Sequence, residues 1–184
     1  LCVSGETPVL CLDSTKVPFY PNYGSAYWYI RRDVTLDQPF VVLLRARMLE
    51  ERFEGSPSGR GAFGLYAGAA NTSQVFAFGF GINPPRVQTY ANDAAEVPVA
   101  FDPTQWHDYR LEVVPGSGFQ LYVDSQITPL VSGPGIPDVG GPYLYLGDGT
   151  SYMAVRAEIS RYSFISQATL ATTGNVLAND SDPD

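Results

Sequence analysis

Apolar and polar residues alternate with a period of two along much of the chain. The longest alternating run covers residues 40–48. Its apolar side consists of Phe40, Val42, Leu44, Ala46 and Met48. Because successive side chains of a strand point to opposite faces, the alternation predicts a half-buried strand. Residues 45–53 are the best helix candidate, but they lack an N-terminal cap and begin inside the alternating run, so we expect no helix.

Shorter alternating runs follow, and turns rich in Gly and Pro separate them. We expect strands at residues 62–68, 75–81, 86–90, 109–114, 119–123, 143–146 and 155–165. Pro115, Gly116 and Gly118 supply the backbone conformations of a tight turn between two of these strands. Residues 50–61 and 132–141 are expected to be loops. Many short strands with regular turns favour a sandwich or a barrel.

The run at residues 75–81 has one aromatic side and one nearly bare side. The aromatic side carries Phe76, Phe78 and Phe80, and the opposite side carries Val75, Ala77, Gly79 and Gly81. A bare strand face is either covered by a large side chain of a neighbouring strand, such as Tyr66, or left open as a groove. Both alternatives remain open from the sequence.

The charge balance excludes two classes of partner. The chain of 184 residues carries 11 Lys and Arg against 19 Asp and Glu, a formal net charge of −8. Nucleic-acid binding needs a basic surface that displaces counterions from phosphates, and binding to anionic lipid needs a basic patch. No apolar run approaches the roughly 18 residues of a membrane span. We therefore expect no nucleic-acid partner and no membrane insertion.

The two cysteines, Cys2 and Cys11, lie close together in the sequence. If Glu6 and Thr7 form a tight turn, Cys2 falls opposite Cys11 across a hairpin, at a separation that suits a disulfide. A disulfide and two free buried thiols are both compatible with the pattern. A disulfide would indicate an oxidising compartment.

Two ordered motifs in the second half of the chain resemble a known family. Residues 101–113 read Phe-Asp-Pro-Thr-Gln-Trp-His-Asp-Tyr-Arg-Leu-Glu-Val, and residues 121–124 read Leu-Tyr-Val-Asp. They resemble the laminin-G-like, concanavalin A-like jelly-roll family, in which a Trp-His-x-Tyr-x-Leu-x-Val strand precedes a Leu-Tyr-Val-Asp-Gly strand. Residues 146–151 and the strand after them are similar to the family's closing pair. Ser125 stands where the family usually has Gly, which suggests a different hairpin turn.

This resemblance implies an all-β fold, a two-sheet antiparallel jelly-roll sandwich of the concanavalin A-like type. We expect the domain to span residues 1–167, with the N-terminal hairpin of residues 1–12 included. Residues 174–184 are similar to the opening of cadherin-like, VCBS-type repeats of bacterial surface proteins. That similarity implies that residues 168–184 are a linker and the start of a following repeat. The full protein would then be secreted or on the cell surface, with covalently linked neighbouring repeats.

Catalytic members of the same family carry closely spaced carboxylates that the chain lacks. Glucanase-like members have a Glu-x-Asp-x-x-Glu or Glu-x-Asp-x-Glu strand, whose glutamates face one cleft. Here Glu50 and Glu51 are adjacent and should point to opposite faces, and Arg156 lies two residues before Glu158. The single histidine, His107, is expected to have a structural role at a strand start. We therefore expect no enzyme.

Carbohydrate binding is the favoured function, because aromatic faces and planar polar groups suit sugar rings and hydroxyls. The candidate residues are Arg45, Arg47, Tyr66, Gln88, Tyr90, Arg156 and Glu158. If the arginines line one concave groove, they favour an anionic glycan. The alternative is that these arginines pair with carboxylates or cover aromatic rings.

Calcium is the candidate ion, because laminin-G-like relatives often hold Ca²⁺ in loops at the rim of the sandwich. Asn92, Asp93 and Asp148 supply suitable oxygens in the body of the chain. The tail adds Asn179, Asp180, Asp182 and Asp184. Ca²⁺ takes six to eight oxygen ligands, so several loops must converge.

The sequence thus predicts a non-catalytic module that binds carbohydrate or extracellular matrix, by aromatic stacking and polar contacts, with Ca²⁺ as a candidate cofactor. One alternative is a structural spacer in a surface stalk that has no small ligand. A third possibility is a glycoside hydrolase or lyase with an atypical site.

Overall fold

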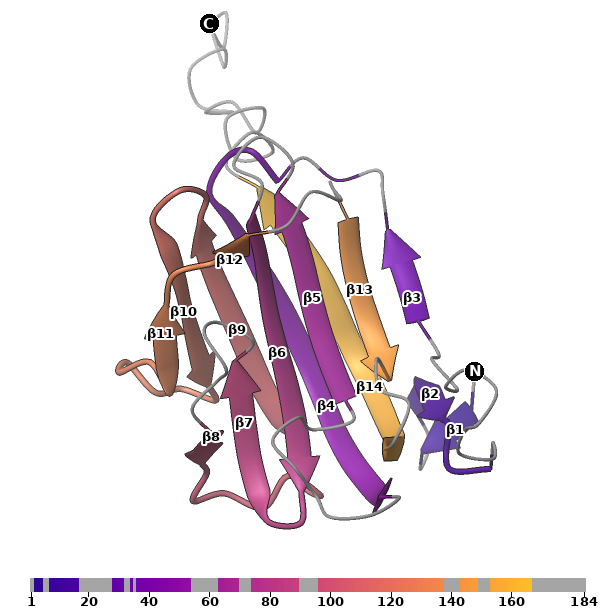
Figure 1. Ribbon diagram of the computed structural model, residues 1–184. Helices are drawn as coiled ribbons and strands as arrows, with labels where there is room; N and C mark the ends of the chain where they lie inside the picture. Colours follow the sequence, from indigo (N-terminus) through magenta and orange to yellow (C-terminus); the bar gives the residue numbers. More distant parts are fainter. Residues whose placement is uncertain are drawn as a thin grey trace, which may run out of the picture.

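The computed structural model in Figure 1 consists of two antiparallel β-sheets that face each other. It describes residues 2–4, 7–16, 28–31, 34, 36–53, 63–69, 74–89, 96–137, 143–148 and 153–166. The expected all-β jelly-roll sandwich is therefore confirmed. Among these residues no helix has the length and apolar character needed to cross a membrane.

The first sheet, called sheet I here, contains the longest strands. Its order is β1 (Cys2–Ser4), β2 (Thr7–Asp13), β14 (Met153–Ser166), β4 (Phe40–Phe53), β9 (His107–Val114), β10 (Gly118–Val123) and β11 (Val131–Gly133). The N-terminal hairpin joins this sheet because β2 pairs with β14. The last described strand, β14, ends one residue beyond the expected boundary at residue 165.

The second sheet, called sheet II, lies in front of sheet I in Figure 1. Its order is β3 (Trp28–Arg31), β13 (Tyr143–Asp148), β5 (Phe63–Ala69), β6 (Gln74–Ile82), β7 (Pro85–Thr89) and β8 (Glu96–Pro98), and β12 (Ile136–Pro137) also pairs with β6. The sequence patterns missed β3, β8, β11 and β12, which are short. Residues 132–141, expected to be a loop, therefore contain strand pairing at both β11 and β12.

The core lies between the inner faces of the two sheets. The alternation predicted for residues 40–48 is confirmed, because every second side chain of β4 from Phe40 to Met48 is buried. The rings of Phe80 on β6 and Tyr109 on β9 meet across the interface at a centroid distance of 4.8 Å. Burial of these apolar faces is the main favourable term for a sandwich of this kind.

A buried ion pair connects the two sheets at one end of the sandwich. The β4–β14 register shifts between Met48 and Glu50, which leaves Glu51 turned inward and Glu50 at the surface. The Glu51 carboxylate accepts a hydrogen bond from Arg86 Nη2 at 3.1 Å and from the backbone N–H of Ile82 at 2.9 Å. The side chains of Glu51 and Arg86 are 1% and 2% exposed. The expected opposite orientation of Glu50 and Glu51 is therefore confirmed.

The nearly bare side of β6 is covered in part by this ion pair. A Cβ atom built on Gly81 would lie 2.3 Å from the Arg86 guanidinium carbon, so the guanidinium occupies the space that a side chain would need. Gly79 pairs with Gln88 on β7 and is also buried. At Gly81 the cover is thus an arginine, where the sequence had suggested a tyrosine such as Tyr66.

The cysteine hairpin has a different register from the expected one. Cys2 lies opposite Val9, and Thr7 opposite Ser4, so the prediction of Cys2 opposite Cys11 is wrong. Thr7, which was expected in the turn, is instead paired with Ser4 in the hairpin. The described part of the chain contains no free cysteine, but the Cys2 side chain lies outside it. A bridge between Cys2 and Cys11 therefore stays a prediction.

Replacing Gly81 by Ala tests the packing of the buried pair. The new methyl group would press on a guanidinium that Glu51 holds in place, so we expect the free energy of unfolding to fall by about 2 kcal/mol. The matched control is Gly133→Ala, whose Cβ would meet Phe119 ring atoms at 3.5 Å, an ordinary contact. Urea unfolding measures both variants. Equal midpoints for the two would show that Arg86 moves aside without cost.

Candidate functional site

Two tyrosines stand beside a row of glycines on the outer face of sheet II. Tyr145 on β13 pairs directly with Tyr66 on β5. The next row on the same face contains Gly147, Gly64, Gly79 and Gln88, and its register continues to Trp28 on β3 and to Glu96 on β8. The neighbouring positions on these strands, such as Leu65 and Leu146, are buried in the core. We call the residues Tyr66, Tyr145, Gly64, Gly79, Gly147 and Gln88 the tyrosine strip.

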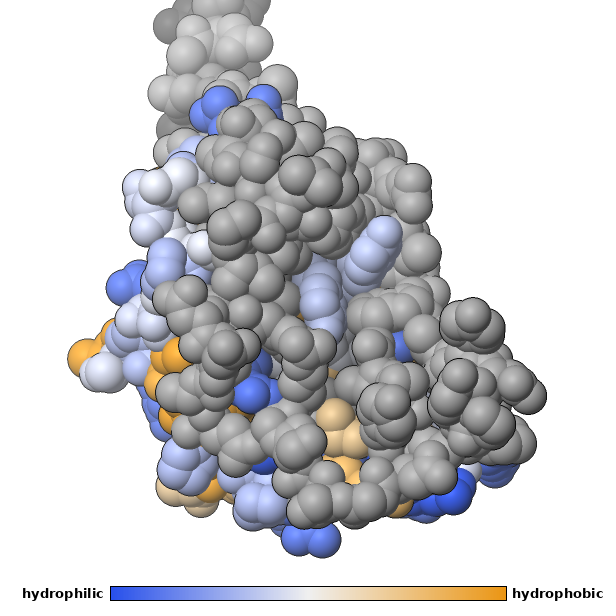
Figure 2. Space-filling view, in the orientation of Figure 1, coloured by the Kyte–Doolittle hydropathy of each residue, from blue (hydrophilic) through white to orange (hydrophobic). Residues whose placement is uncertain are grey.

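The glycine row gives the tyrosine strip its shape. Side chains two residues apart share one face of a strand, so Tyr66 and Gly64 lie side by side, as do Tyr145 and Gly147. Both tyrosines are partly exposed. Glycine adds no side chain beside the rings, and the three glycines themselves are buried. Figure 2 shows this face, where pale-blue side chains lie over β5 and β13 near the centre.

The sequence candidates do not converge on one groove. Tyr66 and Gln88 both belong to the tyrosine strip, and Tyr90 lies outside the described residues. The remaining candidates, Arg45, Arg47, Arg156 and Glu158, are on β4 and β14 of sheet I. Their side chains lie on the outer face of sheet I, opposite to the tyrosine strip, because the alternate residues of the same strands fill the core. The hypothesis of a single groove lined by arginines and Tyr66 is therefore wrong.

Two of the arginines pair one-to-one with carboxylates. Arg47 Nη2 lies 2.8 Å from Glu158, and its guanidinium carbon lies 4.9 Å from the centre of the Trp106 ring. Arg156 Nη2 lies 3.8 Å from Glu50. These contacts match the alternative interpretation, in which strand arginines neutralise carboxylates and cover aromatic rings.

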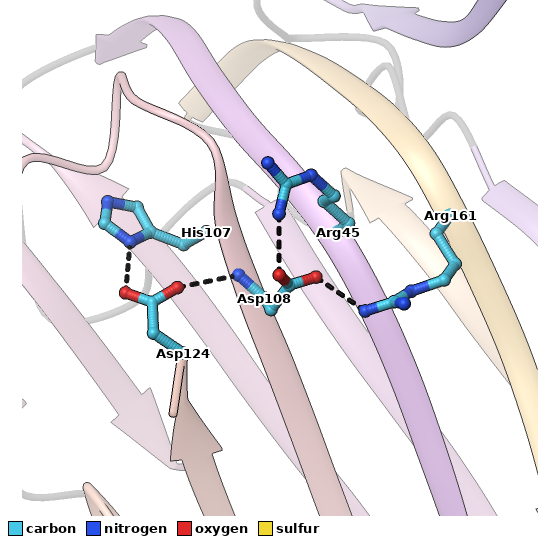
Figure 3. A network of polar contacts seen from close by, with 5 residues as sticks. All are labelled: Arg45, His107, Asp108, Asp124 and Arg161. Carbon is cyan, nitrogen blue, oxygen red and sulfur yellow. Dashed lines mark hydrogen bonds and ion pairs between the residues drawn. The ribbon is translucent and has the colours of Figure 1, made fainter. Parts of the chain in front are cut away.

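A network of charged side chains forms where β9 begins and β10 ends (Figure 3). His107 Nδ1 lies 2.9 Å from Asp124 Oδ2, and His107 Nε2 lies 2.9 Å from the backbone oxygen of Asp102. Both partners are acceptors, so the ring donates to both only as an imidazolium. The backbone N–H of Asp108 donates to Asp124 Oδ1 at 3.0 Å. His107 thus has the structural position at a strand start that the sequence predicted.

The backbone of this turn explains why Ser125 can stand where the family usually has Gly. The left-handed backbone conformation of this turn falls on Asp124, with φ of 55°, one residue before the position where the family usually has Gly. Asp tolerates this conformation better than most residues. Asp108, Asp124 and Arg161 were not singled out from the sequence. The Val-Asp ending of the second motif was the signal that contained Asp124.

The pKa of Asp124 is lowered from its ordinary value. Partial burial acts to raise it, but the hydrogen bonds from the Asp108 N–H and from His107 outweigh burial. A lowered folded-state pKa means that ionised Asp124 stabilises the fold above its unfolded-state pKa. This contribution is lost as the pH falls through the folded-state pKa.

Asp124→Asn removes this charge while keeping a residue that tolerates the left-handed conformation. We expect a loss of about 1 kcal/mol of unfolding free energy at neutral pH, discounted for the exposure of the site. The difference from wild type should shrink as the pH falls below the ordinary aspartate pKa and vanish below the lowered folded-state pKa of Asp124, where both chains are neutral at this position. Urea unfolding between acid and neutral pH measures the effect, and Ser125→Ala in the same turn is the control. A pH-independent difference would contradict the charge-based account.

Asp148, the described calcium candidate, is part of the core rather than a rim loop. It ends β13, is 1% exposed, and accepts a hydrogen bond from the Ser14 hydroxyl at 2.5 Å. Asn92 and Asp93 lie outside the described residues. Within the described ranges, no group of three or more His, Cys, Asp or Glu side chains is placed to hold a metal ion. Asp148 is thus engaged by Ser14 in the described structure, and a calcium site at Asn92, Asp93 and Asp148 stays a prediction.

Comparisons with known proteins support the fold alone. No family model matches the chain, and no curated protein matches it in sequence. A carbohydrate esterase from the Shiga toxin-encoding bacteriophage phi24B has a similar structure, with a TM-score of 0.51, 10% identity and 86% of each chain covered. A Caenorhabditis elegans galectin aligns more loosely, with a TM-score of 0.42, 9% identity, and 78% of this chain and 94% of that chain covered. A legume lectin-like domain from Entamoeba histolytica has a TM-score of 0.36, 11% identity and 87% of each chain covered.

Proposed function

We propose that this chain is a non-catalytic carbohydrate-binding module and that the tyrosine strip holds the sugar. The observation that carries the proposal is the cross-strand pair of Tyr66 and Tyr145 beside the glycine row. Aromatic rings offer a large apolar face with a polar tip, which matches the C–H surface and the hydroxyl rim of a pyranose ring.

The chemistry of the tyrosine strip favours a neutral sugar. Next to the glycine row, Gln88 has a planar amide of the kind that donates to and accepts from sugar hydroxyls, and its side chain is 7% exposed. The side chains of the candidate arginines lie on the opposite outer face, that of sheet I. The phage protein of similar fold is named a carbohydrate esterase, which agrees with a carbohydrate ligand. A fold of this type hosts several functions, so the tyrosine strip and not the fold carries the proposal.

The carboxylates of sheet I support a non-catalytic role. Glu158 is 13% exposed and bound to Arg47, and Glu51 is enclosed with Arg86. A retaining glycosidase needs two carboxyl groups about 5 Å apart across a cleft, one of them protonated. Carboxylates that hold arginines in ion pairs are poorly suited to donating a proton. Hydrolase or lyase activity remains the alternative, and Glu158→Gln would abolish it if Glu158 were the acid.

The proposed setting is a secreted or surface-displayed protein in which this module presents its tyrosine strip to glycans or extracellular matrix. The similarity of residues 174–184 to cadherin-like repeats and the expected Cys2–Cys11 bridge support this setting. Calcium enters only as a variable of the binding experiment, because Asn92, Asp93 and the tail acids lie outside the described residues.

Tyr66→Ala and Tyr145→Ala test the proposal against the wild-type chain. A glycan array with and without EDTA identifies neutral ligands, and calorimetry measures their affinity. Loss of one stacking ring should weaken binding by about tenfold. Tyr66→Phe keeps the ring and is the matched control, which should bind nearly as wild type does.

Three outcomes would contradict this account. Unchanged affinity in both alanine variants would place the ligand elsewhere. No binding to any glycan, with or without EDTA, would favour the structural spacer. Turnover of a glycan that Glu158→Gln abolishes would favour the enzyme.

A further inference from the structure

An open groove lies on the outer face of sheet I, next to the turn that follows β10. Its volume is about 600 Å³. The lining comes from β4, β9, β14 and the turn, and includes Leu43, Asp108, Arg110, Ile127 and Arg161. Sites for small ligands commonly have volumes of several hundred Å³. We call this space the corner groove.

Two guanidinium groups share one carboxylate at the corner groove. Arg45 Nη1 donates to Asp108 Oδ2, and Arg161 Nη2 donates to Asp108 Oδ1, both at 2.6 Å. Figure 3 shows the two arginines reaching Asp108 from β4 and β14. Each bond uses one terminal nitrogen, so further N–H donors remain on both guanidiniums. The arginine side chains are 43% and 50% exposed, which keeps these donors accessible.

The corner groove is also lined by a second carboxylate, Asp124, which lies near Arg45. Asp124 already accepts hydrogen bonds from the Asp108 N–H and contacts His107 Nδ1. Arg110 is matched separately, because its Nε lies 3.4 Å from Glu112 and its guanidinium covers the Tyr122 ring at 4.2 Å. The three arginines of the corner are thus balanced by three carboxylates, in a chain whose net charge is −8.

Apolar side chains accompany the cations. Leu43 forms part of the groove lining, and Ile127 in the turn is 92% exposed. A hydrophobic tip is visible at the left edge of Figure 2, over the turn between β10 and β11. A ligand that suits this groove combines a carboxylate, which guanidinium groups bind in a planar geometry, with an apolar face.

We propose that the corner groove binds a carboxylated sugar unit of a glycan. The carboxylate contacts Arg161, which lines the groove, with Arg45 held beside it on the shared Asp108, and the ring face packs on Ile127 and Leu43. This inference rests on the proposed function, because it takes the ligand to be a glycan. It uses the opposite face of the sandwich, however, so that neutral and acidic sugars occupy separate sites.

The test measures binding of oligogalacturonate by calorimetry, beside a neutral galactose oligomer of the same length and an oligo-aspartate peptide. Arg161→Gln should weaken oligogalacturonate binding by about tenfold, because a hydrogen bond to a charged group is lost. Arg156→Gln is the matched control, since Arg156 is also on β14, is 48% exposed and pairs with Glu50 away from the groove. The affinity of this control for oligogalacturonate should stay within about twofold of the wild-type affinity. Added salt should weaken the wild-type interaction.

The outcomes separate this inference from the proposed function. Tyr66→Ala should weaken neutral binding and leave oligogalacturonate binding unchanged. No binding of oligogalacturonate by the wild type, or equal losses in Arg161→Gln and Arg156→Gln, would overturn the inference. Equal affinity for oligo-aspartate, with the same dependence on Arg161, would overturn the sugar class in favour of an acidic peptide. A wild-type chain that binds oligogalacturonate but no neutral sugar would contradict the tyrosine strip as a binding site and would leave the corner groove supported.

Discussion

The apolar layer between the two sheets is the constraint on which the rest of the structure depends. Each strand commits one of its two faces to this layer, as β4 does with every second residue from Phe40 to Met48. The chemistry of the protein is thereby confined to the two outer faces, which look in opposite directions. Residues with the same alternation can therefore lie on opposite sides of the molecule, depending on which sheet holds their strand. The sheet to which each strand belongs thus decides which candidate residues lie close together.

The two outer faces of the sandwich carry different kinds of side chain. On sheet II, the described outer positions near the centre are tyrosines, glycines and an amide, with Tyr66 and Tyr145 paired across β5 and β13. On sheet I, ion pairs cross the strands, and the charges converge on Asp108 and Asp124. The proposed neutral ligand belongs to the first face and the proposed acidic ligand to the second. The buried pair of Glu51 and Arg86 ties the two sheets together at one end and fixes the β6–β7 turn.

Much of the fold could be predicted from the sequence, because strand alternation and turn residues are local signals. The ends of β9, β10 and β14 were predicted within two residues, whereas β4 continues to Phe53 through residues that were expected to be a loop. Sheet membership is not a local property. Arg45 and Tyr66 both point away from the core, yet the pattern could not show that β4 and β5 belong to different sheets. The hairpin register of Cys2 and the cover of Gly81 by Arg86 depend on pairings that no short window of sequence contains.

The candidate sites were predictable to a lesser degree for the same reason. Tyr66 and Gln88 were among the sequence candidates, but Tyr145 was missed because its partner is nearly 80 residues away in sequence. Asp148 looked like a rim ligand, but its alternation on β13 places it inside with Ser14. Residue type thus indicated the chemistry, and the long-range pairing decided where that chemistry lies.

The most direct test of the central claim is NMR mapping of backbone amide shifts as a neutral oligosaccharide is titrated into the isotopically labelled chain. The account predicts that the shifts gather on β5, β13 and β7, around Tyr66, Tyr145 and Gln88, while the amides of Asp108 and Arg161 stay unchanged. Shifts centred on Asp108 and Arg161 instead, with the tyrosine strip unmoved, would contradict it.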